Sequence, residues 1–558
     1  MNHNYPLYSG HSFYGSFERF VDGIAELYGE KTAITYRANP RDKEPIKVSY
    51  RTFACDVHAL ANEMFKKEMS GKHCALIGRL SYEWVCSYIA LQMIGAVVVP
   101  LDKEWTAEEL SATISFAECQ YLICDADLDE KSSLICKENG AFLIKMNDPE
   151  KHGIFEMMGA GDPYWKYTGV IDTRAMSTLV FTSGTTGKGK GVMLCQDGIL
   201  SDIYNGLKII HAGERSIVSL PPHHTYGSNI GIIALLYAGA NIYISSGLKY
   251  IVQEMKEVKP DFMVLVPLYV ETFHRRICSV LRDSGKEKLV GAMKSISNAL
   301  RHVKIDVRRR VFKQILDSFG GELEFIVSGG APLRPELVRD FESFGISLLN
   351  GYGITECSPL ISVNRNDYNC IGSVGVPIPS MDVKIDNPNE DGEGEICVRG
   401  SNVMLGYYKE PEATAAVIDD QHYFHTGDIG RIDENGVIYI TGRIKNLIIL
   451  SNGKNVYPEE IETAISSISG VSDVVVYEGV SRRGSDHNKV VAEIYPDYDY
   501  LQKNGIEDAN EYFKRYISEY NRSAVKYKQV GYIKVRKEDF PKNTLRKITR
   551  FKLDMSIE

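Results

Sequence analysis

The chain has 558 residues, of which 44% are hydrophobic and 25% charged, and its formal net charge is −9 at pH 7. This length exceeds what one compact core sustains, so we expect two or more domains. The negative charge argues against a protein that binds nucleic acid through a general basic field. Eleven cysteines, with no C-x-x-C pair and no zinc-finger spacing, indicate a reducing compartment.

The sequence also argues against a membrane or secreted protein. The most apolar segments, residues 84–101 and 230–244, are interrupted by polar residues and glycines, and neither supplies the apolar length of a membrane span. The first residues lack a charged region followed by an apolar run, so no secretory signal is predicted. We expect a soluble cytoplasmic protein without a transmembrane segment.

The first two thirds of the chain alternate between strand and helix patterns. Apolar residues recur at helical spacing from Val57 to Phe65, and residues 74–77, 84–94 and 97–100 then read as strand, helix and strand. Such a β-α-β order predicts a parallel sheet. The order recurs, which predicts a large N-terminal α/β domain with several sheets. Further strands are expected at residues 178–183, 191–195, 216–220, 241–245 and 262–267, and further helices at 197–210, 230–237 and 250–258.

Two later segments differ in character. Residues 275–320 are helical and basic, and the face that they form is either solvated or a docking surface. Its basic residues are Arg301, Lys304, Arg308, Arg309 and Arg310. After Thr441, short strands alternate with helices, which predicts a small, separate α+β domain. We place the boundary between residues 1–442 and 443–558.

A glycine-rich loop, FTSGTTGKGKGV, occupies residues 181–192. Glycines let backbone N–H groups close around an anion, and the hydroxyl side chains with Lys188 and Lys190 add donors and charge. The loop is therefore expected to bind a polyphosphate. It is not a nucleoside-triphosphatase P-loop, because Gly191 and a predicted strand follow Lys190 where that motif needs Ser or Thr and a helix. The alternative interpretation is a segment that serves only as a flexible linker.

The loop resembles the phosphate loop of the superfamily of acyl-CoA synthetases, peptide-synthetase adenylation domains and luciferases, with Gly189 where the family usually has proline. Further segments match in the family's order, from about residue 17 to the C-terminus. SLPPHHTYG, residues 219–227, resembles the motif at the mouth of the acid pocket and gives His224 a catalytic position near the carboxylate. Taken alone, such a histidine is more often a packing residue.

Three segments resemble the family's nucleotide site. SGGAP (residues 328–332) and NGYGITE (350–356) match the adenine pocket, with Tyr352 against the base, Thr355 near the α-phosphate as a catalytic residue and Glu356 as the Mg²⁺ ligand. YFHTGDIG (423–430) matches the ribose segment, with Asp428 at the position that binds the ribose hydroxyls. An Asp after Gly is by itself common in turns. The resemblance assigns the following residues to ATP or AMP: Thr182, Ser183, Gly184, Thr185, Thr186, Gly187, Lys188, Lys190, Gly330, Ala331, Asn350, Gly351, Tyr352, Gly353, Thr355, Asp428 and Arg443.

The last matching segments belong to the small domain. TGRIKNLIILSNGKNVYPEEIE, residues 441–462, resembles the family's hinge, with Lys445 at the pivot and Gly453 on the stretch that lines the thiol tunnel. FPKNTLRKITR, residues 540–550, gives Lys547 the position of the catalytic lysine, with Arg546 where the family usually has glycine. Without the resemblance, a lysine in a basic tail is usually only solvated.

The resemblance implies an AMP-forming acid–thiol ligase that uses Mg²⁺, ATP and coenzyme A. The acid is expected to be a medium- or long-chain fatty acid, because residues 221–227 and the basic helical segment are similar to the long-chain branch and residues 223–231 contain no carboxylate to hold an amino group. One alternative is a stand-alone adenylating enzyme that loads an acyl or peptidyl carrier protein, docked on the basic cluster. Another is an inactive nucleotide-binding regulator, against which Lys547 argues.

Overall fold

The computed structural model describes residues 5–8, 10–147, 153–182, 189–450, 455–481, 489–542 and 548–557. Contacts between residues divide the chain into two compact units. The N-terminal unit comprises Met1–Leu333, Leu337–Asp382 and Val398–Phe424, and the C-terminal unit comprises Arg334–Glu336, Val383–Cys397 and His425–Glu558. The predicted division at residue 442, with a mobile small domain, stays a prediction.

The N-terminal unit contains a seven-stranded sheet of order β18-β8-β7-β4-β3-β5-β6. Its strands are β3 (His73–Ile77), β4 (Val97–Leu101), β5 (Tyr121–Cys124), β6 (Phe142–Lys145), β7 (Met176–Phe181), β8 (Gly191–Cys195) and β18 (Gly406–Tyr407). The predicted β-α-β unit is confirmed, because β3 and β4 are parallel and α3 (Tyr82–Met93) packs against both. The pair β7 and β8 is antiparallel, so the glycine-rich loop joins neighbouring strands.

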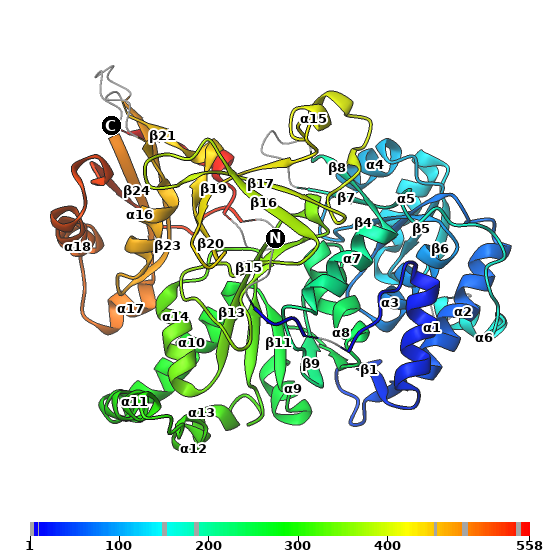
Figure 1. Cartoon of the computed structure of the whole chain (residues 1–558), viewed down its shortest axis with the longest axis horizontal. Helices are drawn as coiled ribbons and strands as arrows, with labels where there is room; N and C mark the ends of the chain where they lie inside the picture. Colours follow the sequence, from blue (N-terminus) through cyan, green and yellow to red (C-terminus); the bar gives the residue numbers. More distant parts are fainter. Residues whose placement is uncertain are drawn as a thin grey trace. The chain divides into compact units, whose positions relative to one another are not determined.

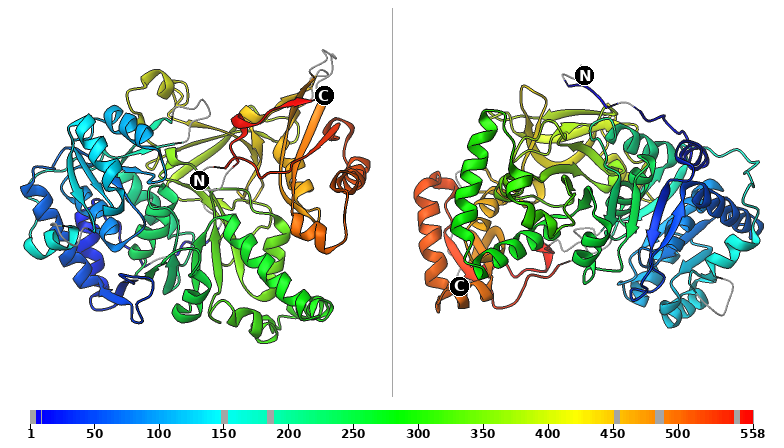
Figure 2. Two further views of the ribbon diagram at one scale, coloured as in Figure 1. Left: turned by 180° about the vertical axis from the view of Figure 1, so that it is seen from behind. Right: turned by 90° about the horizontal axis from the view of Figure 1, so that it is seen from below.

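Helices cover this sheet. The helix α2 (Tyr50–Lys66) packs against α3. Figure 2 shows the early part of the chain, in shades of blue, gathered at one end of the N-terminal unit. On α4 (Ala107–Phe116), Leu110 and Ile114 join a core with Ala75 and Val97 of the sheet. The other helices at this end of the unit are α1 (Phe17–Tyr28), α5 (Asp129–Asn139) and α6 (Ile154–Ala160).

Two further sheets complete the framework of the N-terminal unit (Figure 1). The first has the order β2-β1-β10-β9, with β1 (Thr32–Tyr36), β2 (Ile46–Ser49), β9 (Arg215–Val218) and β10 (Asn241–Ile244). The second has the order β11-β12-β13-β14-β15, with β11 (Phe262–Leu265), β12 (Phe325–Ser328), β13 (Ser347–Gly353), β14 (Leu360–Val363) and β15 (Val376–Pro377). Its first three strands are parallel, and they pack with the neighbouring helices around one apolar core.

The helices of this part include those that the sequence predicts, with one difference in type. They are α7 (Gln196–Gly206), α8 (Ala234–Tyr237), α9 (Ile251–Val258), α10 (Pro267–Asp283), α11 (Glu287–His302), α12 (Arg308–Val311), α13 (Lys313–Asp317), α14 (Pro335–Phe344) and α15 (Pro411–Ala415). The segment predicted as one α-helix at residues 230–237 is instead a π-helix, Tyr226–Ile233, followed by α8. Gly227 permits this wider turn, because a Cβ there would lie 2.0 Å from the Pro221 carbonyl oxygen.

The C-terminal unit is α+β. Most of the sheet β16-β17-β19-β20 belongs to it, with β16 (Met381–Asp386), β17 (Gly394–Gly400), β19 (Phe424–Ile432) and β20 (Ile438–Arg443). A second sheet, β25-β24-β23-β26, contains β23 (Val471–Ser481), β24 (Lys489–Pro496), β25 (Tyr532–Val535) and β26 (Ser556–Ile557). The remaining elements are β21 (Ile448–Ile449), β22 (Asn455–Val456), α16 (Pro458–Ser466), α17 (Tyr498–Lys503) and α18 (Ala509–Ser523). Apolar residues of α16, α18, β23 and β24 form its core.

Candidate active site

The glycine-rich loop is closed at its base. The Thr182 N–H donates to the Lys190 carbonyl oxygen at 3.0 Å, so the two ends of the loop meet. A Cβ at position 189 would lie 2.5 Å from the Thr182 carbonyl oxygen, which explains the glycine there. The predicted phosphate ligands Ser183, Gly184, Thr185, Thr186, Gly187 and Lys188 lie outside the described residues.

Tyr407 connects the end of this loop to the predicted metal ligand. Nζ of Lys190 lies 4.3 Å from the centroid of the Tyr407 ring, a cation–π contact. The Tyr407 hydroxyl donates to Oε1 of Glu356 at 2.9 Å. Burial, and then the Glu356 carboxylate, raise the pKa of Tyr407, so the phenol stays a donor. No motif in the sequence pointed to Tyr407, which lies 51 residues beyond Glu356.

Glu356 itself lies in a short 3-10 turn, Thr355–Cys357, that follows β13. Its carbonyl oxygen accepts from the Met404 N–H at 2.7 Å. Thr355 is the first residue of this turn, directly before Glu356. Glu356 is held at both its backbone and its side chain. A single carboxylate of this kind is a typical protein ligand of Mg²⁺ when phosphates supply further oxygens.

A buried network of hydrogen bonds holds this turn in place. Asn402 donates to Oδ1 of Asp202 at 2.9 Å and to the Cys357 and Leu360 carbonyl oxygens at 2.8 and 2.9 Å. The Ser358 hydroxyl donates to the Asn402 carbonyl oxygen at 2.8 Å. Burial raises the pKa of Asp202 well above its ordinary value, which favours the neutral form of this carboxyl. The network fixes the backbone on which Thr355 and Glu356 stand.

The two adenine segments meet through strand register. Ser328 of β12 pairs with Asn350 of β13, so the turn that contains Gly330 and Ala331 begins beside the start of the NGYGITE segment. Gly330 has φ +85°, a conformation that favours glycine. The Asn350 side chain donates to the Ser373 carbonyl oxygen at 3.0 Å. Tyr352, with Gly351 and Gly353 on either side, is 7% exposed.

An apolar pocket borders these adenine residues. Its empty volume is about 810 Å³, part of it open to solvent. The lining includes Gly330 and Tyr352, and Tyr226 and Ile230 of the π-helix. The rest of the lining consists of Ile203, Gly206, Leu207, Ile210, Ala212, Ala234, Leu235, Phe262, Val264, Phe325, Val327, Gly329, Gly351, Gly353, Pro359, Leu360 and Val363. None of these side chains carries a charge.

His224 and His223 precede the π-helix. Their rings lie 4.3 Å apart between centroids, and the Ser228 N–H donates to the His224 carbonyl oxygen at 2.9 Å. Nε2 of His223 lies 3.5 Å from a carboxylate oxygen of Asp102. Burial lowers the pKa of His223, an effect that the Asp102 charge opposes. The lowered pKa favours the neutral form of His223, and Asp102 is a contact that the sequence did not indicate.

In the C-terminal unit, Asp428 and Arg443 face each other across β19 and β20. Nε of Arg443 lies 2.6 Å from Oδ1 of Asp428, whose side chain is 3% exposed. The two residues that the resemblance assigned to ribose therefore form one ion pair, because antiparallel register places them directly opposite. Lys445 is exposed in the 3-10 turn Ile444–Asn446 that follows, and Gly453 lies outside the described residues.

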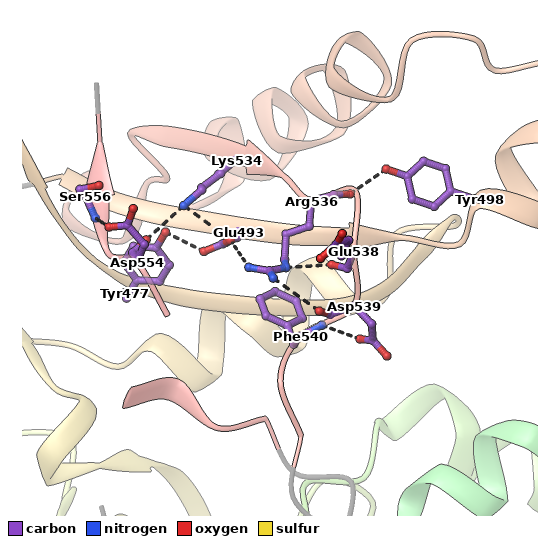
Figure 3. A network of polar contacts seen from close by, with 10 residues as sticks. All are labelled: Tyr477, Glu493, Tyr498, Lys534, Arg536, Glu538, Asp539, Phe540, Asp554 and Ser556. Atoms are coloured by element: carbon purple, nitrogen blue, oxygen red, sulfur yellow. Dashed lines mark hydrogen bonds and ion pairs between the residues drawn. The ribbon is translucent and has the colours of Figure 1, made fainter. Parts of the chain in front are cut away.

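Lys547 lies outside the described residues, but the residues that flank residues 543–547 are fixed. Lys542 and Ile548 form a β-bridge, and Lys542 pairs with Asp473 at 2.9 Å. The segment before Lys542 is anchored at the buried Glu493, which lies 2.7 Å from Arg536 and accepts from the Tyr477 hydroxyl at 2.8 Å (Figure 3). This charged network joins β23, β24 and β25 to the segment that precedes the predicted catalytic lysine.

The sequence profile described as "AMP-binding enzyme" matches residues 21–408, more than half of the chain. The chain belongs to this family. Long-chain-fatty-acid–CoA ligase 5 of Mus musculus is 27% identical to this AMP-binding enzyme over 530 residues, which cover 87% of the chain and 76% of the relative. Long-chain-fatty-acid–[acyl-carrier-protein] ligase AEE15, chloroplastic, of Arabidopsis thaliana is 27% identical over 579 residues, which cover 88% and 78%.

Solved structures share the fold of this AMP-binding enzyme. ATP-bound MatB from Rhodopseudomonas palustris has a TM-score of 0.77 at 23% identity, over 96% of this chain and 97% of that one. A Mycobacterium tuberculosis fatty acyl CoA synthetase has a TM-score of 0.66 at 19% identity, over 96% of each chain. At these identities the similarity is one of fold. The predicted α/β fold class and the resemblance to adenylate-forming enzymes are confirmed.

Two other expectations of the sequence concern surfaces. Among the described residues, no helix has both the length and the apolar character to cross a membrane. In the basic segment, Arg308 donates to the Glu342 carbonyl oxygen and Arg309 to those of Leu323 and Gly321, at 2.5 to 2.8 Å. These two arginines hold the segment against the rest of the unit, whereas Arg301, Lys304 and Arg310 are exposed.

Proposed function

We propose that this AMP-binding enzyme activates a medium- or long-chain fatty acid as acyl-AMP and transfers the acyl group to coenzyme A. The observation that carries the proposal is the apolar pocket beside Gly330 and Tyr352. An acyl chain in this pocket would direct its carboxylate toward the nucleotide residues, because none of the described lining residues has a charged side chain to hold it. The names of the relatives, ligases of long-chain fatty acids, support the same substrate class.

The pocket also favours a fatty acid over other acids. An amino acid or a dicarboxylic acid would leave a second charge without a partner among the lining residues, at a cost that binding does not recover. An acyl chain instead gains about 0.8 kcal/mol for each CH₂ group that it buries. Selection by length would then depend on how deep the pocket extends beyond Ile230.

In the proposed reaction, the substrate carboxylate attacks the α-phosphorus of ATP and pyrophosphate leaves. Lys190 and the loop of residues 182–190 would hold the phosphates, and Lys547 would bridge the carboxylate and the α-phosphate as negative charge builds there. Glu356 would hold Mg²⁺, which neutralises phosphate charge when bound. Tyr407 keeps the Glu356 carboxylate in place through its hydrogen bond. The ion pair of Asp428 and Arg443 would open to receive the ribose hydroxyls.

The second half-reaction needs a thiol. We propose coenzyme A, with the small domain turning about Lys445 between the two steps. A carrier protein is the alternative, and the name of the Arabidopsis relative supports it. The three exposed cations Arg301, Lys304 and Arg310 are the part of the basic cluster that remains available to an acidic partner.

The proposal is tested by ATP–pyrophosphate exchange with acids from acetate to palmitate, and with aromatic and amino acids. We expect exchange with one chain-length class of fatty acid, followed by thioester formation with coenzyme A. Thioester formation only with an acyl carrier protein would support the alternative acceptor. Exchange with none of the acids, despite tight ATP binding, would overturn the enzymatic proposal in favour of a nucleotide-binding regulator.

A further inference from the structure

Three side chains with metal-binding atoms converge in the C-terminal unit. Glu395 and Cys397 lie two residues apart on β17, so their side chains share one face of the sheet, and His425 lies on the neighbouring strand β19. Nδ1 of His425 lies 2.8 Å from Oε2 of Glu395 and 3.4 Å from Sγ of Cys397. All three ligand atoms lie within 4.8 Å of one another, the one such group in the part of the chain that the structure describes.

The donor set favours one class of metal ion. A thiolate, an imidazole and a carboxylate together suit Zn²⁺ and similar borderline ions, whereas Mg²⁺ and Ca²⁺ prefer oxygen ligands alone. Three protein ligands leave a fourth tetrahedral position for water. The site is reachable, because the side chains of Glu395 and His425 are 18% and 28% exposed while Cys397 is buried beneath them.

The charge around the group also favours a cation. In the described part of the chain, the ionic partner of Glu395 is His425 alone, and no lysine or arginine neutralises the carboxylate. A second set of a cysteine, a histidine and a carboxylate, whose ligand atoms do not all lie within 4.8 Å of one another, shows the contrast. There, Cys278 and Asp340 contact His274, but Nζ of Lys294 already lies 2.8 Å from Asp340. A metal ion at that second group would meet an ammonium at close range.

The converging group is also attached to the part of β19 that precedes Asp428. Oε1 of Glu395 accepts from the Gly427 N–H at 2.9 Å, and the Thr426 hydroxyl donates to the Ile396 carbonyl oxygen at 2.7 Å. The Asp428 N–H donates to the Thr426 hydroxyl at 3.1 Å. An ion bound to Glu395 and His425 would therefore add a further link between β17 and residues 425–427, which lie directly ahead of Asp428.

We propose that Glu395, Cys397 and His425 form a binding site for one Zn²⁺ ion, which clamps the start of β19 ahead of Asp428. Binding replaces the proton of the Cys397 thiol, which passes to the buffer, and leaves the imidazole neutral with its proton on Nε2. The sequence did not reveal the site, because His425 lies 28 residues from Cys397 and 30 from Glu395, which matches no zinc-finger spacing. The inference does not rest on the proposed ligase activity.

The test is a titration of the full-length, chelator-treated protein with Co²⁺, a spectroscopic substitute for Zn²⁺. We expect a near-ultraviolet charge-transfer band from the thiolate that saturates at one ion per chain and disappears when Zn²⁺ is added. Cys397→Ser should remove the band, and Glu395→Gln, which keeps an oxygen for Gly427, should weaken binding by about tenfold or more. Cys278→Ser is the matched control and should keep both band and affinity.

Absence of the band from the wild-type protein would overturn the proposal, as would a band that survives in Cys397→Ser. If Cys397→Ser proves unstable in urea unfolding, His425→Asn provides the second variant, since its side chain is partly exposed. A thiolate band that persists unchanged in His425→Asn would place the ion on other cysteines and reject the site. These readouts are independent of ATP and of the acid, so failure here leaves the proposed ligase activity unaffected.

Discussion

The Tyr407 hydroxyl donates a hydrogen bond of 2.9 Å to Glu356. The ring of the same tyrosine contacts Lys190, whose Nζ lies 4.3 Å from the ring centroid. One side chain thus connects the base of the glycine-rich loop to the carboxylate expected to hold Mg²⁺. Tyr407→Phe keeps the ring over Lys190 and removes the hydrogen bond. We expect roughly tenfold slower adenylation and a higher Mg²⁺ requirement, since a hydrogen bond to a charged group contributes about 1.5–3 kcal/mol.

The neighbouring tyrosine provides the control for this prediction. The Tyr408 hydroxyl donates to Glu118 at 2.9 Å on the surface, away from Glu356. Tyr408→Phe should leave both the adenylation rate and the Mg²⁺ dependence unchanged. Pyrophosphate exchange at several Mg²⁺ concentrations measures both variants, and equal effects of the two substitutions would contradict the role given to Tyr407.

The two half-reactions should separate in variants of the C-terminal unit. Lys547→Ala should reduce adenylation by about 10²–10³ or more, because it removes a preorganised cation from the transition state, yet spare thioester formation from pre-formed acyl-AMP. Lys445→Pro should have the opposite selectivity, since proline restricts the backbone at the proposed pivot. Single-turnover assays of each half-reaction measure both, and equal losses in the two steps would refute the assignments.

Chain-length selection should respond to the pocket wall. Ile230→Trp enlarges a lining side chain and should shift the preferred acid toward shorter chains, with each excluded CH₂ group costing about 0.8 kcal/mol of binding. Ile296→Trp is the control, because that side chain is 63% exposed on α11. The profile of kcat/KM against chain length measures this shift. An unchanged profile in Ile230→Trp would place the acyl chain outside this pocket.

The stability of the N-terminal unit should decrease in mild alkali. Burial alone would lower the pKa of His274, but hydrogen bonds with Asp340 and Cys278 outweigh it and raise this pKa to about 9. Because the unfolded value is near 6.5, the stabilisation is complete below pH 6.5 and is lost as the pH rises to 9. We expect a loss of about 1 kcal/mol, less than full linkage would give, because the Asp340 side chain is 38% exposed.

Urea unfolding at pH 6.5 and pH 9 measures this loss. In His274→Asn the difference between the two pH values should be smaller by the same amount, since asparagine does not titrate. The acid side behaves in the opposite sense. Burial would raise the pKa of Asp340, but its bonds to His274 and Lys294 lower it to about 2, so this contribution is lost as the pH falls from about 4 toward 2. If His274→Asn lost as much stability between pH 6.5 and pH 9 as the wild type does, the alkaline loss could not be assigned to His274.

Much of the local structure could be predicted from the chain alone. The helix around Val57–Phe65 and the strands at residues 74–77 and 191–195 are confirmed, because their apolar periodicity is a local property. The π-helix at Tyr226–Ile233 could not be predicted, because its wider turn depends on how Gly227 meets Pro221. Likewise, the antiparallel pairing of β7 with β8 is a choice of partner that neither strand's pattern specifies.

By itself, the sequence determined the order of the motifs. It also predicted the chemistry of the glycine-rich loop and, through the family resemblance, the residues assigned to nucleotide, metal and acid. Only the tertiary structure decided which distant residues meet. Tyr407 forms a hydrogen bond with Glu356 from 51 residues away, and Asn402 with Asp202 from 200 residues away. Glu395, Cys397 and His425 likewise converge only in the folded chain. The physical reason is that a hydrogen bond or a ligand set depends on distance in space. Sheet register and buried packing set that distance, and no pattern within a short segment encodes it.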